Sequence, residues 1–526
     1  MSQAESALTN VGASVSVTPS VNASVGNEVT AVAVQTGSGT VVFATFNSNF
    51  GSFLPDGNKT HCGWAKSNSS QTSFTSYDSY YNPLPIPTMS SGSPYERCLG
   101  DTWAAALGPQ RQSQAVMVAV AQANDDTRDV VLWVTNNGGT SFTSATTIST
   151  LPTGAGADGP KVAIDATNNA AYVWWANEDS NGIKTHYLRR ANIALNGSVS
   201  LGPLQTLTNK LPGTATPLHA VITIRKAVGT ALPRIFLAYP TAGMSLIPDC
   251  FNNPSQTGVV NWYLAYSDNG GSTWTSHLVD TDPAFPMCQF QSPSNDEFLK
   301  RLGGNRSYIS AVYDGTTGGS GRVLLAYQRH EDDENGDYVG TRINVAHWPS
   351  EPMGIGFDRW KPACNPAICP PSGGNCLVDG RLPAGETYCT QYGQSVAVRG
   401  AGGASQMAIV WHDTRDTPSS HPQPMVGDAT SRNIVKSDIW GVSVRPGEPK
   451  DTCTLISCPK TQSRITPLSS TVPWLPTATN GNLWWGDYEQ GIATLGNNFF
   501  AVWADNRDQS LTTRIRGAAF DYGQAP

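Results

Sequence analysis

The sequence has few charged residues and no long apolar run, and these absences narrow the possible functions. Only 14% of the 526 residues are Asp, Glu, Lys or Arg, and the formal net charge is −7. Because no basic run occurs, we expect no nucleic-acid partner and no acidic membrane surface as a partner. No apolar segment approaches the roughly 20 residues that span a bilayer, so we expect no membrane span.

The ten cysteines lack any Cys-x-x-Cys pair, and they stand in Pro/Gly-rich, loop-like surroundings. An even number of such cysteines predicts disulfides and an oxidising, extracellular compartment, although no signal-peptide core follows the first residues. We expect the pairs Cys62–Cys98, Cys250–Cys288 and Cys453–Cys458, with the remaining four bonded among themselves: Cys364, Cys369, Cys376 and Cys389. Zinc bound by that group of four is the alternative.

Residues that favour turns are abundant, with 51 Gly and 36 Pro in the chain. This composition favours short strands joined by many turns, so we expect an all-β fold. A large all-β fold built from repeated strands can form one unit, as the repeats described below indicate. We therefore expect residues 1–526 to be a single domain. The segment 361–389, which carries four cysteines, is predicted to be a loop insertion within it.

A hydroxyl-Asn-Gly-Gly-hydroxyl-aromatic turn recurs along the chain. It is clearest at Ser267–Trp274 and Thr135–Phe142, and a weaker copy lies at Ser67–Phe74. Asn and Gly accept positive φ, so each copy predicts a hairpin turn between strands. The copies begin at residues 67, 135 and 267, so the second spacing is about twice the first. Such a period is typical of a four-stranded propeller blade with generous loops.

This turn resembles the Asp box (Ser-x-Asp-x-Gly-x-Thr-Trp) of the sialidase superfamily of β-propellers, except that the central Asp is Asn269. We expect these turns to be structural, because in a propeller blade they lie on the face opposite the start of the blade's first strand. The resemblance implies a secreted, carbohydrate-active protein. Sialidases have six blades, and their Phe/Tyr-Arg-Ile-Pro motif is absent here, with Pro233–Phe236 as only a partial echo.

A second repeat consists of a small-residue strand followed by a continuous apolar strand, the latter typical of burial on both faces. The first strands are expected at Val29–Val34, Trp103–Leu107, Val162–Asp165, Ala220–Ile224, Tyr308–Tyr313, Val396–Val398 and Ile492–Leu495. The second strands are expected at Val41–Ala44, Val116–Ala119, Ala171–Trp175, Ile235–Tyr239, Val323–Tyr327, Met407–Trp411 and Phe499–Trp503. These seven pairs predict a seven-bladed β-propeller, with six blades as the alternative. We expect Ala13–Thr18 to complete the last blade by pairing with Arg514–Phe520.

The starts of the first strands and the ends of the second strands share one face of a propeller, and uncommon residues gather there. The strand starts carry Glu28, Asp101, Asp158, His219, Arg306 and the run Trp485-Gly486-Asp487-Tyr488-Glu489. The strand ends carry Arg329, His330, Asp413, Arg415, Asp505 and Arg507. Carboxylates beside Arg, with aromatic rings to stack on sugars, favour a glycan site at the channel mouth. An inter-blade salt bridge is the alternative for the Asp and Arg residues after the two tryptophans, Trp411 and Trp503.

Sialidases bind the substrate carboxylate with three arginines, and they use a Tyr nucleophile assisted by Glu together with an Asp acid/base. The resemblance therefore implies a glycoside hydrolase acting on an acidic glycan. Its candidate catalytic residues are Asp487, Tyr488, Glu489, Asp413 and Asp101. Its candidate substrate-binding residues are Arg415, Arg507, Asp505, Arg329, Arg306, His219, Glu28 and Trp485.

Two other functions fit the same pattern. A lectin would use the propeller and its aromatic residues without catalysis. A polysaccharide lyase would use His and Tyr, for which His219 or the pair His186-Tyr187 are the candidates. We expect no cofactor. Glu331, Asp333 and Asn335 form half of a calcium loop, but Ile343 stands where the closing Glu belongs.

Overall fold

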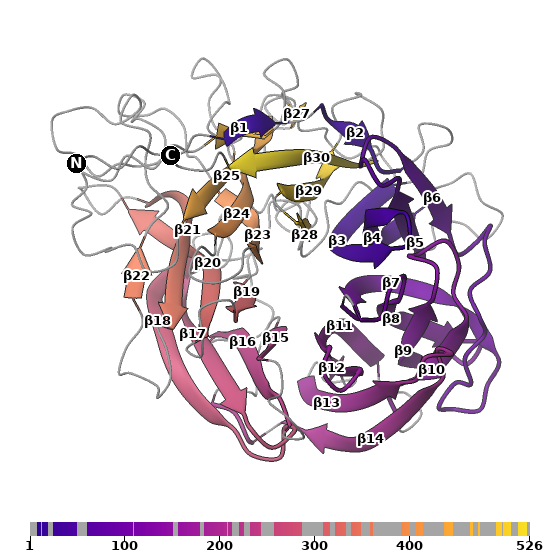
Figure 1. Cartoon of the computed structure of the whole chain (residues 1–526). Helices are drawn as coiled ribbons and strands as arrows, with labels where there is room; N and C mark the ends of the chain where they lie inside the picture. Colours follow the sequence, from indigo (N-terminus) through magenta and orange to yellow (C-terminus); the bar gives the residue numbers. More distant parts are fainter. Residues whose placement is uncertain are drawn as a thin grey trace, which may run out of the picture.

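The computed structural model shows an all-β chain, and no helix occurs in the ranges that it describes (Figure 1). Within those ranges, therefore, no helix is long and apolar enough to cross a membrane. The described residues are 8–11, 13–18, 25–49, 60–108, 110–150, 156–178, 184–207, 209–212, 220–225, 232–242, 257–286, 309–315, 321–332, 338–348, 358–360, 391–399, 406–413, 436–444, 463–465, 472–473, 491–496, 498–505 and 514–522.

The described strands form six sheets. The first contains β3 (Val25–Thr36), β4 (Gly39–Asn49), β5 (Thr60–Ser67) and β6 (Phe74–Asp78). The second contains β7 (Tyr95–Ala106), β8 (Ala115–Ala123), β9 (Arg128–Thr135), β10 (Ser144–Thr147), β11 (Gly156–Asp165), β12 (Ala170–Glu178), β13 (Lys184–Ile193) and β14 (Val199–Thr206). This eight-stranded sheet is two antiparallel meanders of four strands, joined by the single parallel pair Gly156–Arg128.

The other four sheets follow the same meander pattern. Two of them contain β15 (Val221–Arg225), β16 (Arg234–Ala242), β17 (Thr257–Ser267) and β18 (Thr275–Pro286), then β19 (Ile309–Asp314), β20 (Arg322–Asp332), β21 (Tyr338–Trp348) and β22 (Asp358–Trp360). The last two contain β23 (Gln391–Arg399), β24 (Gln406–Asp413), β25 (Lys436–Val444), β26 (Ser463–Arg464) and β27 (Val472–Pro473), then β28 (Ile492–Leu495), β29 (Asn498–Asp505), β30 (Arg514–Tyr522), β1 (Leu8–Val11) and β2 (Val15–Ser16).

The meanders are arranged in a ring, with the first strand of each lying nearest the centre (Figure 1). These first strands touch one another in a closed cycle, in the order β3, β7, β11, β15, β19, β23 and β28, after which β28 contacts β3. Radially packed antiparallel meanders around a central axis are the architecture of a β-propeller. The core lies between neighbouring meanders, where the second strands are buried on both faces; every residue of β8 is buried.

The predicted pairing of first and second strands is confirmed throughout. Each expected first strand falls in one of the seven innermost strands and extends beyond it by at most one residue, although Tyr308 lies outside the described residues. Each pairs antiparallel with the apolar strand predicted to follow it. The continuous apolar runs therefore identified the buried second strands correctly.

The chain start completes the last sheet, as the sequence predicted. Val15 and Ser16 of β2 pair with Gly517 and Arg516 of β30. A further strand that the sequence did not suggest, β1, pairs with the other end of β30. The N-terminal strands thus cover the outer edge of the C-terminal sheet.

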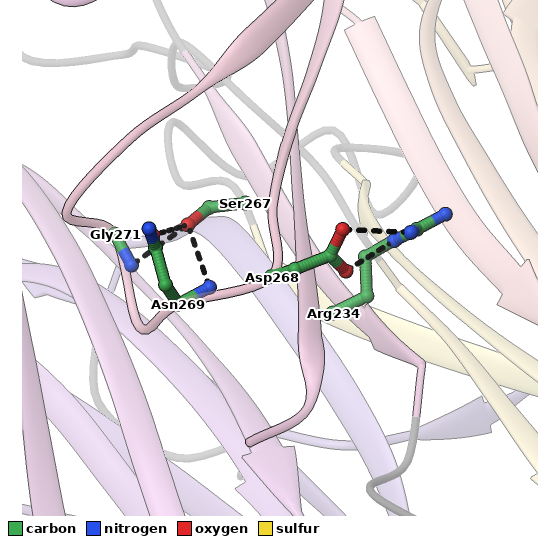
Figure 2. Close-up of polar contacts among 5 residues, drawn as sticks. All are labelled: Arg234, Ser267, Asp268, Asn269 and Gly271. Carbon is green, nitrogen blue, oxygen red and sulfur yellow. Dashed lines mark hydrogen bonds and ion pairs between the residues drawn. The ribbon is translucent and has the colours of Figure 1, made fainter. Parts of the chain in front are cut away.

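The recurrent Asn-Gly turns join the third and fourth strands of their meanders, at the end of the ring opposite the starts of the first strands. In the turn after β17, Gly271 N donates to Ser267 Oγ at 2.9 Å (Figure 2). Thr273 N donates to Asn269 Oδ1 at 2.9 Å. The turn after β9 has equivalent bonds, from Gly139 N to Thr135 Oγ1 and from Ser141 N to Asn137 Oδ1. Asn in place of Asp thus satisfies the turn, because its amide oxygen accepts the same backbone bonds.

Each turn also packs against the preceding meander. A Cβ on Gly139 would lie 2.3 Å from the Phe43 ring of β4, and one on Gly271 would lie 2.6 Å from Leu188 of β13. Both glycines have positive φ, +95° and +93°. Arg234 forms a bidentate ion pair with Asp268 within the β17 turn region, at 2.6 and 2.7 Å (Figure 2). The turns therefore serve packing between sheets.

One predicted disulfide is observed: Cys62 of β5 is bonded to Cys98 of β7, and both residues are buried. It links two neighbouring meanders. The other eight cysteines and the predicted insertion 361–389 lie outside the described residues.

Candidate functional site

Four of the seven innermost strands have a β-bulge near their first residues. The register with the second strand shifts between Asn27 and Thr30 in β3, Gly100 and Trp103 in β7, Asp158 and Lys161 in β11, and Tyr392 and Ser395 in β23. Each shift places one extra residue in the inner strand. Bulges redirect side chains and occur frequently beside active sites. We call this end of the ring, where the first strands begin and the second strands end, the mouth.

The bulge in β7 holds Asp101 in a conformation that is uncommon for a residue with a side chain. Its φ is +52°, and it follows Gly100 at +120°. Asn47, near the end of β4, accepts a hydrogen bond from Asp101 N at 2.7 Å. A Cβ on Gly100 would lie 2.8 Å from the same Asn47 oxygen, so the approach requires glycine. Strained backbone maintained by its surroundings is typical of functional sites.

Asp101 and Asp158 form a carboxyl pair across β7 and β11. Their side chains share a hydrogen bond, and both residues are half-buried. Gly159 N in the β11 bulge donates to Asp101 Oδ2 at 3.3 Å. Burial, followed by the charge of Asp158, raises the pKa of Asp101 to about 6, against the opposing effect of the Lys161 charge. The pair can therefore retain a proton in mildly acidic solution, as a general acid requires.

Lys161 brings a positive charge to the same two strands. Its side chain is 1% exposed, and its Nζ lies 4.5 Å from the centre of the Trp103 ring. The aromatic face and the nearby carboxyl pair both stabilise a buried ammonium group. The arrangement of two carboxyls and one lysine is nearly charge-balanced when the pair holds one proton.

The disulfide braces this site. Cys62 lies directly across from Asn47 in the β4–β5 pairing, and its partner Cys98 precedes Asp101 by three residues. Asn47 and the disulfide thus both connect β7 to the preceding meander near the bulge, through a hydrogen bond and a covalent link.

Arg329, predicted to bind substrate, pairs with a carboxylate of the neighbouring meander. Its Nη1 lies 3.2 Å from Asp280 Oδ2, and the hydroxyl of Tyr327 donates to the same oxygen at 3.0 Å. Asp280 belongs to β18 and is buried, whereas Arg329 belongs to β20. This contact ties two meanders together, and a role of Arg329 in substrate binding stays a prediction.

Asp505, another predicted substrate-binding residue, is 1% exposed at the end of β29. It accepts a hydrogen bond from Trp503 Nε1 at 3.0 Å, within the same strand. The Trp-x-Asp pattern thus has a local structural reason. Arg507, its predicted partner, lies outside the described residues.

The remaining predicted residues are placed only in part. Glu28 lies in the β3 bulge, and Asp413 ends β24, paired in register with Gln391 and Asp438. These two share the mouth with Asp101 by position on their strands. The other candidates lie outside the described residues: Asp487, Tyr488, Glu489, Arg415, Arg306, His219 and Trp485.

For the calcium loop, Glu331 lies in β20, whereas Asp333 and Asn335 are outside the described residues. Within the described ranges, no group of three His, Cys, Asp or Glu residues is placed to hold a metal ion.

The pair His186-Tyr187, a candidate for lyase chemistry, lies in β13, the third strand of its meander. His186 is 1% exposed and stacks on Trp174 at 5.5 Å, while Tyr187 stacks on Trp175 at 5.5 Å. The third strand is remote from the central axis, so this pair is part of the packing between strands (Figure 1).

From the sequence, no role was assigned to Asp158, and Lys161 was not identified. A sequence feature that could have located them is a glycine beside a polar residue at the bulge of an inner strand. It occurs in Gly26-Asn27-Glu28, Gly100-Asp101-Thr102, Asp158-Gly159-Pro160 and Tyr392-Gly393-Gln394. A recurrent Gly-polar pair ahead of a small-residue strand predicts a bulge whose side chains turn away from the regular alternation.

Comparisons with known proteins find likeness in structure only. No protein-family profile matches the chain. No curated protein sequence matches it either. The chain resembles sialidase-like β-propellers in structure. The solved structures that it resembles include sialidases, the superfamily that the sequence resemblance named.

Three solved structures illustrate this likeness. A GH93 α-L-arabinofuranosidase of Fusarium graminearum, in complex with arabinobiose, has 9% identity and a TM-score of 0.42, over 84% of this chain and 98% of that one. A Trypanosoma rangeli sialidase has 10% identity and a TM-score of 0.36, over 77% of this chain and 53% of that one, about half of its length. A fucose-specific lectin from Aleuria aurantia has 11% identity and a TM-score of 0.33, over 80% of this chain and 96% of that one.

Proposed function

We propose that this chain is a secreted, seven-bladed β-propeller that hydrolyses glycosidic bonds, with the carboxyl pair Asp101–Asp158 as its proton donor. The observation that carries the proposal is the raised pKa of Asp101, about 6, at a strained bulge of an innermost strand. Perturbed carboxyls of this kind occur at catalytic sites, where a general acid must be protonated near the working pH.

The pair acts as one acid and does not supply both catalytic groups. In retaining glycosidases the two carboxyls lie about 5–5.5 Å apart, and in inverting ones they lie farther apart. Asp101 and Asp158 are in hydrogen-bond contact and therefore closer than either arrangement. One shared proton passes from the pair to the leaving-group oxygen. The second catalytic group is then a nucleophile or base from the predicted mouth residues, with Tyr488 and Asp413 as the leading candidates.

The substrate in this proposal is an acidic glycan. Lys161 contributes positive charge beside the pair, and Arg306, Arg415 and Arg507 are the arginines proposed to bind a substrate carboxylate. Arginine suits this role because its planar donor fork matches a carboxylate. The Cys62–Cys98 disulfide supports an extracellular location, since disulfides persist in oxidising compartments. We also propose that the remaining predicted disulfides form and that a calcium ion binds at Glu331.

The test compares the parent protein with Asp101→Asn on a panel of 4-methylumbelliferyl glycosides that includes a sialoside. Asn tolerates positive φ, so this change keeps the bulge while removing the acid. We expect kcat to fall about 10²–10⁴-fold. In the parent protein, activity should decline as the pH rises above about 6, where the pair loses its proton.

Asp268→Asn is the matched control, because the same chemical change is made in an exposed turn at the opposite end of the ring. It should leave turnover unchanged. Equal activity of Asp101→Asn and the parent protein would remove the carboxyl pair from catalysis.

A lectin is the second candidate, favoured by exposed aromatic rings on a described loop. Tyr80 and Tyr81 are 38% and 63% exposed and stand edge to face at 5.0 Å. A parent protein that binds immobilised glycans but cleaves none of the panel would establish binding without catalysis.

A further inference from the structure

The segment between β6 and β7, residues 79–94, is a well-anchored surface loop that carries two neighbouring tyrosines, which we call the tyrosine platform (Tyr80 and Tyr81). Ser79 exchanges two hydrogen bonds with the backbone of Cys62, at 2.9 and 3.2 Å. Farther along, the indole of Trp133 donates to Pro85 O at 3.0 Å. These bonds fix both ends of the tyrosine-bearing part of the loop.

The platform itself is held by local bonds. Tyr80 N donates to Asp78 Oδ1, and Asn82 N donates to Asp78 O, both at 2.8 Å. The Tyr80 ring packs edge to face on His61, 5.4 Å away, and on Tyr81, 5.0 Å away. Tyr81 is nevertheless 63% exposed, so it presents a ring to solvent from an ordered base. Tyrosine offers a large amphipathic contact area at a small cost in side-chain entropy.

The platform lies at the mouth, on the same side of the ring as the carboxyl pair. β6 runs from its Asn-containing turn towards the mouth, and the loop then leads into β7, which contains Asp101. A short path of contacts joins the two places: Tyr80 packs on His61, which precedes Cys62, and Cys62 is bonded to Cys98 on β7. From strand rise and these contacts, the platform lies on the order of 20 Å from Asp101.

We propose that the tyrosine platform is a remote binding subsite for a sugar ring of an oligosaccharide or polysaccharide. This inference rests on the proposed function and narrows its substrate class to glycan chains several residues long. A single-sugar glycoside at the carboxyl pair is too short to reach the platform, whereas a chain lying along the mouth face contacts both. Stacking on the exposed ring then contributes to the binding of long substrates alone.

The experiment uses the full chain and two substrates of one sugar: the 4-methylumbelliferyl monoglycoside that the parent protein cleaves best, and the five-residue oligosaccharide. In Tyr81→Ala, kcat/KM for the oligosaccharide relative to the monoglycoside should fall about five- to tenfold, through KM. Tyr81→Phe keeps the ring and should retain the parent ratio. Leu195→Ala removes an exposed apolar side chain, 77% exposed, from a turn at the opposite end of the ring and should change neither value.

An unchanged ratio in Tyr81→Ala overturns the subsite while the hydrolase proposal stands. Should the parent protein cleave nothing, an array of immobilised oligosaccharides decides the matter. Binding that is lost in Tyr81→Ala and retained in Leu195→Ala supports the platform and rejects catalysis, whereas absence of binding in the parent protein rejects both.

Discussion

The two ends of the ring use the same kinds of residue to opposite effect. In the turns after β9 and β17, Asn137 and Asn269 accept backbone bonds from the residues that follow them, and positive-φ glycines pack on the neighbouring meander. At the mouth, Asp101 also has positive φ and follows a glycine, yet it faces a second carboxyl. The first arrangement satisfies its polar groups and stabilises the fold. The second places two carboxyls close together, an arrangement that occurs frequently at functional sites.

The largest effect on stability is expected from a substitution in one of the turns. Gly139→Ala should lower the free energy of unfolding by about 3 kcal/mol, because the new methyl group meets the Phe43 ring and the backbone has φ of +95°. Gly37→Ala is the control, since nothing lies within 4 Å of the added Cβ. Chemical denaturation measures both. A loss of equal size in the two variants would show that the turn does not pack as described.

A smaller effect of opposite sign is expected at the mouth. The folded-state pKa of Asp101, about 6, exceeds the ordinary value of 3.8, so between these two pH values the folded protein retains a proton that the unfolded chain has released. Stability is therefore fully present below about pH 4 and is lost as the pH rises through about 6. Asp101→Asn should raise the free energy of unfolding at pH 8 by on the order of 1–2 kcal/mol.

At pH 4 the same substitution should have little effect, because the parent pair is then protonated and does not repel. Thermal unfolding of both proteins at the two pH values measures the difference. A variant that is less stable at pH 8 would mean that the carboxyl pair supports the fold in the way that the turns do.

The smallest effect is expected at the surface of the β17 turn. Asp268→Asn removes the ion pair with Arg234, but the Asp268 side chain is 53% exposed. Exposed pairs contribute little and are screened by salt, so we expect a loss of about 0.5 kcal/mol that fades at high ionic strength. Unfolding in low and high salt distinguishes this from a larger, salt-independent loss, which would place the pair in the core of the turn.

The sequence predicted the repeat well because a buried strand has a composition of its own. Runs such as Val116–Ala119 and Ala171–Trp175 are apolar on both faces, and local composition alone identifies them. The pairing of Ala13–Thr18 with the last strand followed from the need to cover an edge. The Cys62–Cys98 pair followed from the closeness of these two cysteines in the sequence, 36 residues apart.

The carboxyl pair and Lys161 were harder to predict from sequence patterns. Whether Asp101 meets Asp158 depends on two bulges in different strands, and a bulge shifts the alternation of side chains by one residue. In the sequence, nothing distinguishes Lys161 from any other strand residue. Only the structure shows that its ammonium group lies over the Trp103 ring. Such contacts arise between repeats, whereas sequence patterns describe the inside of one repeat.

The pairing of β2 with β30 has a consequence for biosynthesis. Thr18 Oγ1 accepts a hydrogen bond from Ile515 N across a separation of 497 residues. A ribosome adds residues from the N-terminus onward, so the first strands emerge long before their partner exists. Until the last strand is made, the nascent chain carries an open sheet edge at each end of the array, where it is susceptible to misassociation with other chains. The pairing of β2 with β30 must therefore wait until β30 has been synthesised, and we expect a loss of β2 to reduce soluble yield more than it alters any residue near the carboxyl pair.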